Sequence, residues 1–172
     1  MRKILTLMVV MVATVAIAGT ALGATVTFNP SAAPSGTHVQ TGMPSCSVDG
    51  LTVTCASYEL AGVGNANATA TLSATYSATV DCTNKGGKLV PVKSTPQTAT
   101  STTGVLEPKN GRLTVPELTS APAPSDADFL AAATCPNGNW TKTVQEGSAT
   151  LDNWTYTLTF TGFTGAYITI TP

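Results

Sequence analysis

Few side chains in this sequence could serve as catalytic bases or metal ligands. Its 172 residues include one histidine, His38, and nine acidic residues. His38 stands in a stretch rich in proline, serine and glycine, which does not hold an imidazole rigidly as a Ser-His-Asp triad requires. The sequence has no Gly-x-Ser-x-Gly turn, and its cysteines lack the CxxC spacing of a zinc site. We therefore expect no metal, no cofactor and no nucleophilic catalysis.

A pair of carboxylates is the remaining catalytic possibility, because two acids at a suitable separation hydrolyse glycosidic bonds. The candidates are Asp49, Glu59, Asp81, Glu107, Glu117, Asp126, Asp128, Glu146 and Asp152. Most stand in expected turns or at strand ends, where acids form turns and solubilise the surface. We expect a protein that is not an enzyme, and keep a small secreted glycan-active hydrolase as an alternative.

The two tryptophans are the better candidates for a function, because exposed aromatic rings stack on sugars in carbohydrate-binding modules. Trp154 alternates in phase with Leu158 and Phe160, which predicts a place in the core. Trp140 shares its expected face with Lys142 instead. We therefore predict Trp140 as a ligand contact, with a glycan or another surface protein as partner.

The first 23 residues are typical of a secretory signal peptide. Arg2 and Lys3 precede an uncharged apolar run, which closes on Ala21-Leu22-Gly23 before Ala24. An uncleaved membrane anchor is the alternative, since about 20 uncharged residues can span a bilayer. After removal of residues 1–23 we expect a secreted, extracellular protein without stable membrane insertion.

The mature chain, residues 24–172, is small, mildly acidic and rich in cysteine pairs. Removal of 23 of the 172 residues leaves 149, and the loss of Arg2 and Lys3 moves the formal charge from −1 to −3. This charge argues against nucleic acid as a partner. The four cysteines, Cys46, Cys55, Cys82 and Cys135, predict two disulfides in an exported protein, with three pairings possible. The hairpin dipeptide Asp49-Gly50 favours a local Cys46–Cys55 bond, which would leave Cys82 to close a long loop with Cys135.

Period-two alternation of apolar and hydroxyl residues dominates the mature chain. Residues 65–82 alternate alanine, leucine, tyrosine and valine with threonine and serine, which predicts a strand that is bent or broken near residues 73–77. Residues 154–161 and 168–170 predict a terminal hairpin. Further strands are expected at 24–28, 51–55 and, as an edge strand containing Pro91, 88–93. Residues 105–106 and 113–115 are expected to pair around a turn at 109–111. Residues 29–44 form a stretch containing proline, serine and glycine, residues 94–103 a Ser/Thr-rich connection, and residues 120–125 are expected to be irregular. Residues 126–133 are expected to form a helix capped by Ser125.

These elements predict an all-β fold in one domain spanning residues 24–172. About eight short strands separated by turn signals are typical of an antiparallel, immunoglobulin-like β-sandwich, here stabilised by disulfides.

Several turn and cysteine motifs carry a resemblance to a known group. These are Ala61-Gly62-Val63-Gly64-Asn65, Cys82-Thr83-Asn84-Lys85-Gly86-Gly87, Cys135-Pro136-Asn137, and Asn-Trp-Thr before a terminal hairpin. Over residues 46–172 the chain resembles a group of small secreted bacterial proteins of uncharacterised function. The resemblance implies a compact disulfide-bonded β-rich fold and bacterial export, and it implies no activity.

Two features admit a role in assembly or surface binding. Residues 24–28 could pair with a neighbouring subunit, which would make the protein a self-assembling fibre or surface-layer subunit; an ordinary first strand is the alternative. Thr-x-Thr recurs along the strands, and regular threonine ladders can bind ice, but no repeat of fixed length supplies equal spacing. We expect a secreted non-catalytic protein, either a binding module or a surface-associated structural protein.

Overall fold

The computed structural model describes residues 24–172, so the predicted signal peptide at 1–23 lies outside the described residues. The strands are β1 Thr25–Phe28, β2 His38–Thr41, β3 Cys46–Asp49, β4 Thr52–Cys55, β5 Tyr58–Ala61, β6 Ala68–Ser77, β7 Thr79–Thr83, β8 Leu89–Lys93, β9 Gln97–Thr102, β10 Arg112–Val115, β11 Leu118–Thr119, β12 Thr141–Val144, β13 Thr150–Phe160 and β14 Ile168–Thr171. The helical elements are a 3-10 turn η1, Pro30–Ala32, and the helix α1, Asp126–Ala132. The predicted β-rich class is confirmed.

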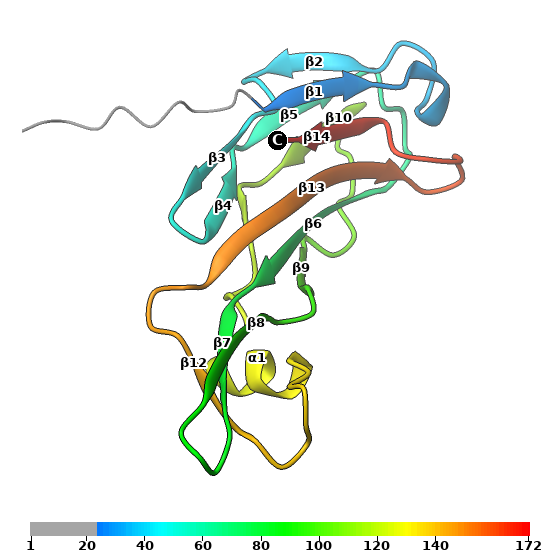
Figure 1. Ribbon diagram of the computed structural model, residues 1–172. Helices are drawn as coiled ribbons and strands as arrows, with labels where there is room; N and C mark the ends of the chain where they lie inside the picture. The colour runs from blue at the N-terminus through cyan, green and yellow to red at the C-terminus, as the bar shows by residue number, and fades with distance from the viewer. Residues whose placement is uncertain (1–23) are drawn as a thin grey trace, which may run out of the picture.

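The strands pair antiparallel in four sheets. The five-stranded main sheet has the order β1-β14-β13-β6-β9, and two smaller sheets have the orders β10-β5-β2 and β11-β4-β3. The fourth, the distal sheet β12-β7-β8, lies with α1 at one end of the molecule (Figure 1). The chain therefore consists of a large layered part and a smaller distal part.

The core lies between the main sheet and the two smaller sheets. Most of its buried residues come from the alternating apolar positions of β6, β13 and β14 and from β4, β5, β10 and β11, and Phe129 of α1 belongs to the same cluster. At the centre the hydroxyls of Tyr58 on β5 and Tyr156 on β13 are 2.9 Å apart and share a buried hydrogen bond. Trp154 is 5% exposed in this core, as its phase in the alternation predicts.

One continuous run of chain links the two parts. β6 pairs with β13 and β9, whereas β7 pairs with β12 and β8. The change of partners occurs at buried Ala78, whose N–H donates to the Ser94 hydroxyl at 2.9 Å and whose carbonyl accepts from the Ser94 N–H at 2.8 Å. The predicted break in the long alternating strand is confirmed next to the expected position.

Both disulfides are formed as the turn chemistry favours. Cys46–Cys55 joins β3 to β4 across the Asp49-Gly50 turn, and Cys82–Cys135 joins β7 to the segment after α1.

The predicted helix is also confirmed, as α1. The Ser125 hydroxyl accepts from the Asp128 N–H, and the Asp128 carboxylate accepts from the Ser125 N–H. The Asp128 carboxylate also accepts from the Ser125 hydroxyl at 2.7 Å, and this bond, with the one from the Ser125 N–H, holds the pKa of Asp128 below its usual value.

The edge position of β8 is confirmed, with Pro91 opposite Asp81. The terminal hairpin is confirmed as β13 and β14. Three local predictions are wrong. Residues 97–102 form β9 within the expected Ser/Thr-rich connection, and β2 lies within the stretch containing proline, serine and glycine, where no strand was expected. Residues 113–115 pair with β5, while Leu106 bridges Ala68, so the predicted pairing of 105–106 with 113–115 does not form. In each case the partner comes from a distant segment, and long-range pairing outweighs the local turn signal.

Candidate functional site

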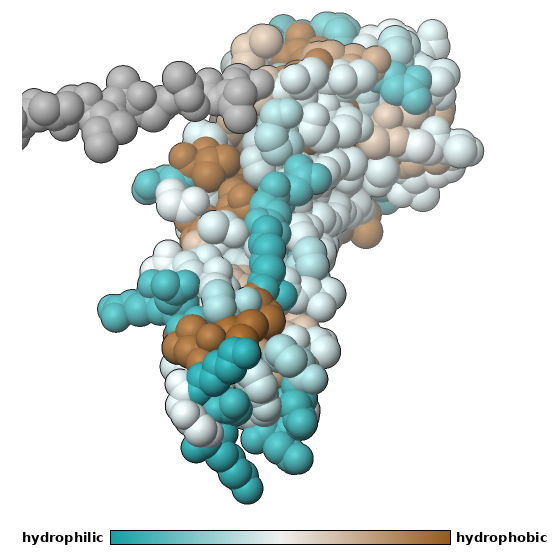
Figure 2. All heavy atoms as spheres, in the orientation of Figure 1, coloured by the Kyte–Doolittle hydropathy of each residue, from teal (hydrophilic) through white to brown (hydrophobic). Residues whose placement is uncertain are grey.

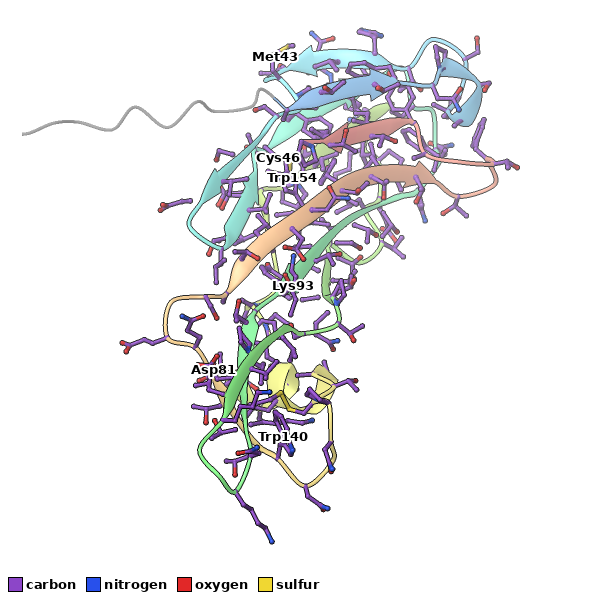
Figure 3. The ribbon with its side chains drawn as sticks, viewed as in Figure 1. Met43, Cys46, Asp81, Lys93, Trp140 and Trp154 are labelled. Carbon is purple, nitrogen blue, oxygen red and sulfur yellow. A yellow bond between two sulfur atoms is a disulfide. The ribbon has the colours of Figure 1, made fainter. Side chains whose placement is uncertain are left out.

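A hollow of about 330 Å³ opens at the distal end of the molecule. Its lining consists of Asn84, Lys85 and Gly86 from the β7–β8 loop and of Asn137, Asn139 and Trp140 from the segment before β12. Figure 3 shows Trp140 at this end, below α1 and far from Trp154. The space-filling view shows hydrophilic atoms gathered at the same tip (Figure 2). The predicted contact Trp140 thus lies in a surface hollow and is half-buried.

The Cys82–Cys135 disulfide fastens together the two segments that line this distal hollow. Cys82 is the fourth residue of β7, two residues before Asn84, and Cys135 precedes Asn137 by two residues. Strand pairing adds to this link, because Thr141 at the start of β12 lies opposite Thr83. The two motifs that carry the sequence resemblance around these cysteines therefore meet at one place.

Asparagine side chains shape both loops. The Asn84 Oδ1 accepts from the N–H groups of Gly86 and Lys88, each at 2.9 Å. The Asn137 Oδ1 accepts from the Asn139 N–H at 3.0 Å, and the Asn137 carbonyl accepts from the Trp140 N–H at 3.2 Å. These short bonds order the loops before any ligand arrives, which lowers the entropic cost of binding.

Lys142, predicted to share a face with Trp140, has a structural role beside the hollow. Its Nζ donates to the carbonyls of Leu130 at 2.9 Å and Ala133 at 2.7 Å, both at the end of α1. The last carbonyls of a helix have no partner within the helix and carry partial negative charge, so an ammonium stabilises them. Lys142 therefore attaches α1 to β12.

We expect Lys142→Met to lower the free energy of unfolding by about 2 kcal/mol, because two hydrogen bonds to a charged donor are lost. Urea denaturation measures this change. Lys93→Met is the matched control: the Lys93–Asp152 pair, 3.4 Å apart, has an exposed lysine and should contribute less than about 1 kcal/mol. Equal losses in the two variants would show that Lys142 does not hold the helix.

A second hollow, of about 590 Å³, lies beside β5 and β10. It is lined by Glu59, Val105, Leu106, Glu107, Lys109, Arg112 and Thr114. Two carboxylates thus share a hollow, as the hydrolase alternative requires, but Glu59 accepts from the Arg112 guanidinium at 2.9 Å. The ion pair gives Glu59 a structural partner across β5 and β10, and the hollow holds both acidic and basic side chains.

The remaining candidates for chemistry form no cluster of three or more among residues 24–172. His38 is exposed on β2, and its Nδ1 lies 2.8 Å from the Gly36 carbonyl. Within residues 24–172 no group of three or more His, Cys, Asp or Glu side chains could hold a metal ion.

The outer face of the main sheet presents threonines in rows. Register aligns Thr27, Thr169, Thr157, Thr71 and Thr102 across all five strands. Beside this row Thr25 faces Thr171, and Thr155, Ser73 and Thr100 are aligned. The space-filling view is pale over much of β13 and β6, as expected for threonine and serine, and a hydrophilic stripe crosses this part of the molecule (Figure 2). The sequence has no fixed repeat, but the long-range register itself supplies rows in which residues on neighbouring strands are about 4.8 Å apart.

The N-terminal strand lies in the chain's own sheet. β1 pairs with β14 through four residue pairs at the edge of the main sheet. Phe28 packs edge-on against Tyr167, with ring centroids 5.8 Å apart. This arrangement corresponds to the ordinary first strand that the sequence left as an alternative to strand donation.

The sequence predicted Trp140 as a ligand contact, whereas Asn84, Lys85 and Asn137 appeared only within turn motifs and none of them was predicted as a site residue. Asparagine and glycine near a cysteine are first of all turn formers, and only the disulfide brings the two turns to one hollow. None of the helices among residues 24–172 is long and apolar enough to cross a membrane. No family model matches the chain, and neither the curated proteins nor the solved structures contain a significant match.

Proposed function

We propose that the protein is an exported, non-catalytic binding module that recognises a glycan at the distal hollow. One observation carries this proposal: Trp140 lies half-exposed in a hollow between two loops that a disulfide and asparagine hydrogen bonds hold in place. An aromatic face offers a stacking surface to the C–H groups of a sugar ring. Amide side chains around it offer hydrogen bonds to hydroxyl groups.

The size and position of the hollow suit part of a longer saccharide. A volume of about 330 Å³ lies at the lower end of the range for small-molecule sites. Because the hollow opens at one end of the molecule, a polymer could run past it while one or two units enter.

The setting of this function follows from the disulfides. Two disulfides in a small domain are typical of an oxidising, extracellular environment. Together with the predicted signal peptide at 1–23 and the resemblance to small secreted bacterial proteins, they support secretion by a bacterium as our proposal. For the layered part we propose an immunoglobulin-like sandwich, supported by the packing of the main sheet against two smaller antiparallel sheets.

We expect Trp140→Ala to weaken glycan binding by about thirtyfold, which corresponds to about 2 kcal/mol for a central aromatic contact. A glycan array probed with the mature chain identifies the ligand, and titration calorimetry measures the change. Phe163→Ala, which removes an aromatic ring 38% exposed in the β13–β14 turn, is the matched control and should bind normally. An array without any bound glycan, or equal binding by both variants, would contradict the proposal.

The threonine rows favour a second candidate, binding of ice. Rows of methyl and hydroxyl groups at constant spacing resemble the periodic oxygen positions of an ice surface, and no charged residue stands in these rows. The twist of the sheet works against an extended match, because adjacent strands rotate by roughly 20°. We therefore place this candidate after glycan binding.

Ice binding predicts measurable thermal hysteresis in solutions of the mature chain. Thr157→Lys, in the middle of the five-residue row, should abolish it by placing a hydrated cation in the array. Thr114→Lys on β10, outside the main sheet, is the control and should retain it. A mature chain without hysteresis excludes this candidate.

A further inference from the structure

The distal hollow is rich in hydrogen-bond donors whose partners are not supplied by the protein. The Asn84 and Asn137 side chains use their Oδ1 atoms as acceptors within their own loops, while their Nδ2 groups remain as donors. Within residues 24–172 neither Nδ2 makes a hydrogen bond, and the same holds for the Lys85 Nζ and the Trp140 Nε1. Four side chains of the lining therefore offer donors to a ligand.

The charge of the hollow has one sign. Lys85 lines it, and Lys88 in the same loop is exposed. Residues 83–88 and 134–140 contain no aspartate or glutamate. Asp81 alternates along β7 with buried Cys82, so its side chain points to the opposite face of the distal sheet from the disulfide.

The nearest source of partial negative charge is already neutralised. The carbonyls at the end of α1 carry the negative end of the helix dipole, but Lys142 donates to two of them. The local positive charge of the loops thus persists in a chain whose mature form is acidic as a whole. An anionic group brings acceptors only, which suits the donors and the positive charge of these loops.

We infer that the ligand of the distal hollow is an acidic saccharide, whose carboxylate or sulfate accepts from Lys85 and the two asparagine amides while the ring stacks on Trp140. This inference rests on the proposed glycan-binding function and adds the charge class of the glycan. Charge-assisted hydrogen bonds are stronger than neutral ones, and a donor cluster without a counter-charge gains most from an anion.

The test compares matched oligosaccharides by titration calorimetry with the mature chain. The probes are a galacturonic acid oligosaccharide, the same oligosaccharide after reduction of its carboxylates to alcohols, and a sulfated galactan oligosaccharide of equal length. We expect at least tenfold tighter binding of an acidic probe than of the reduced one. The galacturonate and sulfate arms then distinguish the two sources of negative charge.

Two variants place the charge preference at the hollow. Lys85→Gln should reduce the preference for the acidic probe by at least fivefold while keeping the fold, and Lys109→Gln beside β10 should leave it unchanged. Equal binding of the acidic and reduced probes would overturn the inference and leave glycan binding intact. An acidic preference insensitive to both Lys85→Gln and Trp140→Ala would overturn it as well, and failure to bind any glycan overturns both proposals.

Discussion

Removal of the Cys82–Cys135 disulfide by the double change Cys82→Ala and Cys135→Ala is expected to lower the free energy of unfolding by about 4 kcal/mol. The bond joins residues 53 positions apart, and the entropy it removes from the unfolded chain grows with the logarithm of this loop. The double change Cys46→Ala and Cys55→Ala opens a separation of only 9 and should cost about 2.7 kcal/mol. Urea denaturation of both variants measures the two values.

The same disulfide should matter more for binding than for the layered core. It connects the two loops around Trp140, whereas Cys46–Cys55 joins a hairpin on the other part of the molecule (Figure 3). We therefore expect glycan affinity to be lost in the first variant and kept in the second under conditions where both remain folded. An unfolding free energy that changes more in the Cys46–Cys55 variant, or affinity lost equally in both, would contradict this assignment.

The buried tyrosine pair is expected to make the protein sensitive to alkali. Burial raises the pKa of Tyr156 to about 12 and raises the pKa of Tyr58 further, in the latter case helped by the neighbouring Tyr156. In the unfolded chain both titrate near pH 10. Below pH 10 both states hold the same protons, and above it the unfolded chain loses protons that the folded protein keeps.

Stability should therefore be independent of these groups below pH 10 and fall as the pH rises above it. Each tyrosine lowers the free energy of unfolding by about 1.4 kcal/mol per pH unit, so the pair lowers it by about 2.7 kcal/mol per unit. For Tyr156 this fall ends near pH 12, where the folded protein also ionises. Denaturation midpoints measured in urea from pH 8 to 12 test the slope.

Tyr58→Phe separates the ionisation from the hydrogen bond. The variant loses the bond to Tyr156, which costs about 1 kcal/mol at every pH, but it removes one titrating group. Above pH 10 its free energy of unfolding should fall with pH about half as steeply as that of the unchanged protein. Parallel slopes would show that the buried pair does not control alkaline unfolding.

Local patterns in the sequence predicted several elements correctly, because the interactions that form them lie within a few residues. The alternation of residues 65–82 fixes which side chains face the core, and Ser125 with Asp128 forms a helix cap within four residues. Asp49-Gly50 likewise forms the turn that brings Cys46 opposite Cys55.

Other elements depended on partners far along the chain. β9 carries few apolar residues and becomes a strand only because β6 supplies its hydrogen bonds over the register from Thr71–Thr102 to Tyr76–Gln97. Leu106 could pair with the nearby strand at 113–115, but it bridges Ala68 instead. The choice between such partners depends on which arrangement buries the apolar faces of the strands against one another. A short stretch of sequence does not reveal this, because the faces belong to strands far apart along the chain.

The candidate site likewise has some features that the sequence predicts and others that depend on long-range contacts. Sequence by itself determined the aromatic type of Trp140, the paired cysteines and the low charge of the chain. Only the tertiary structure brought Asn84 and Lys85 beside Asn137, because these residues are some fifty positions apart and a disulfide joins their loops. Sequence likewise determined that threonines alternate along each strand, but their alignment into rows follows from the pairing of five strands drawn from the whole chain. Alternation is a property of a single extended strand, whereas the register between strands is set by how all the strands pack together.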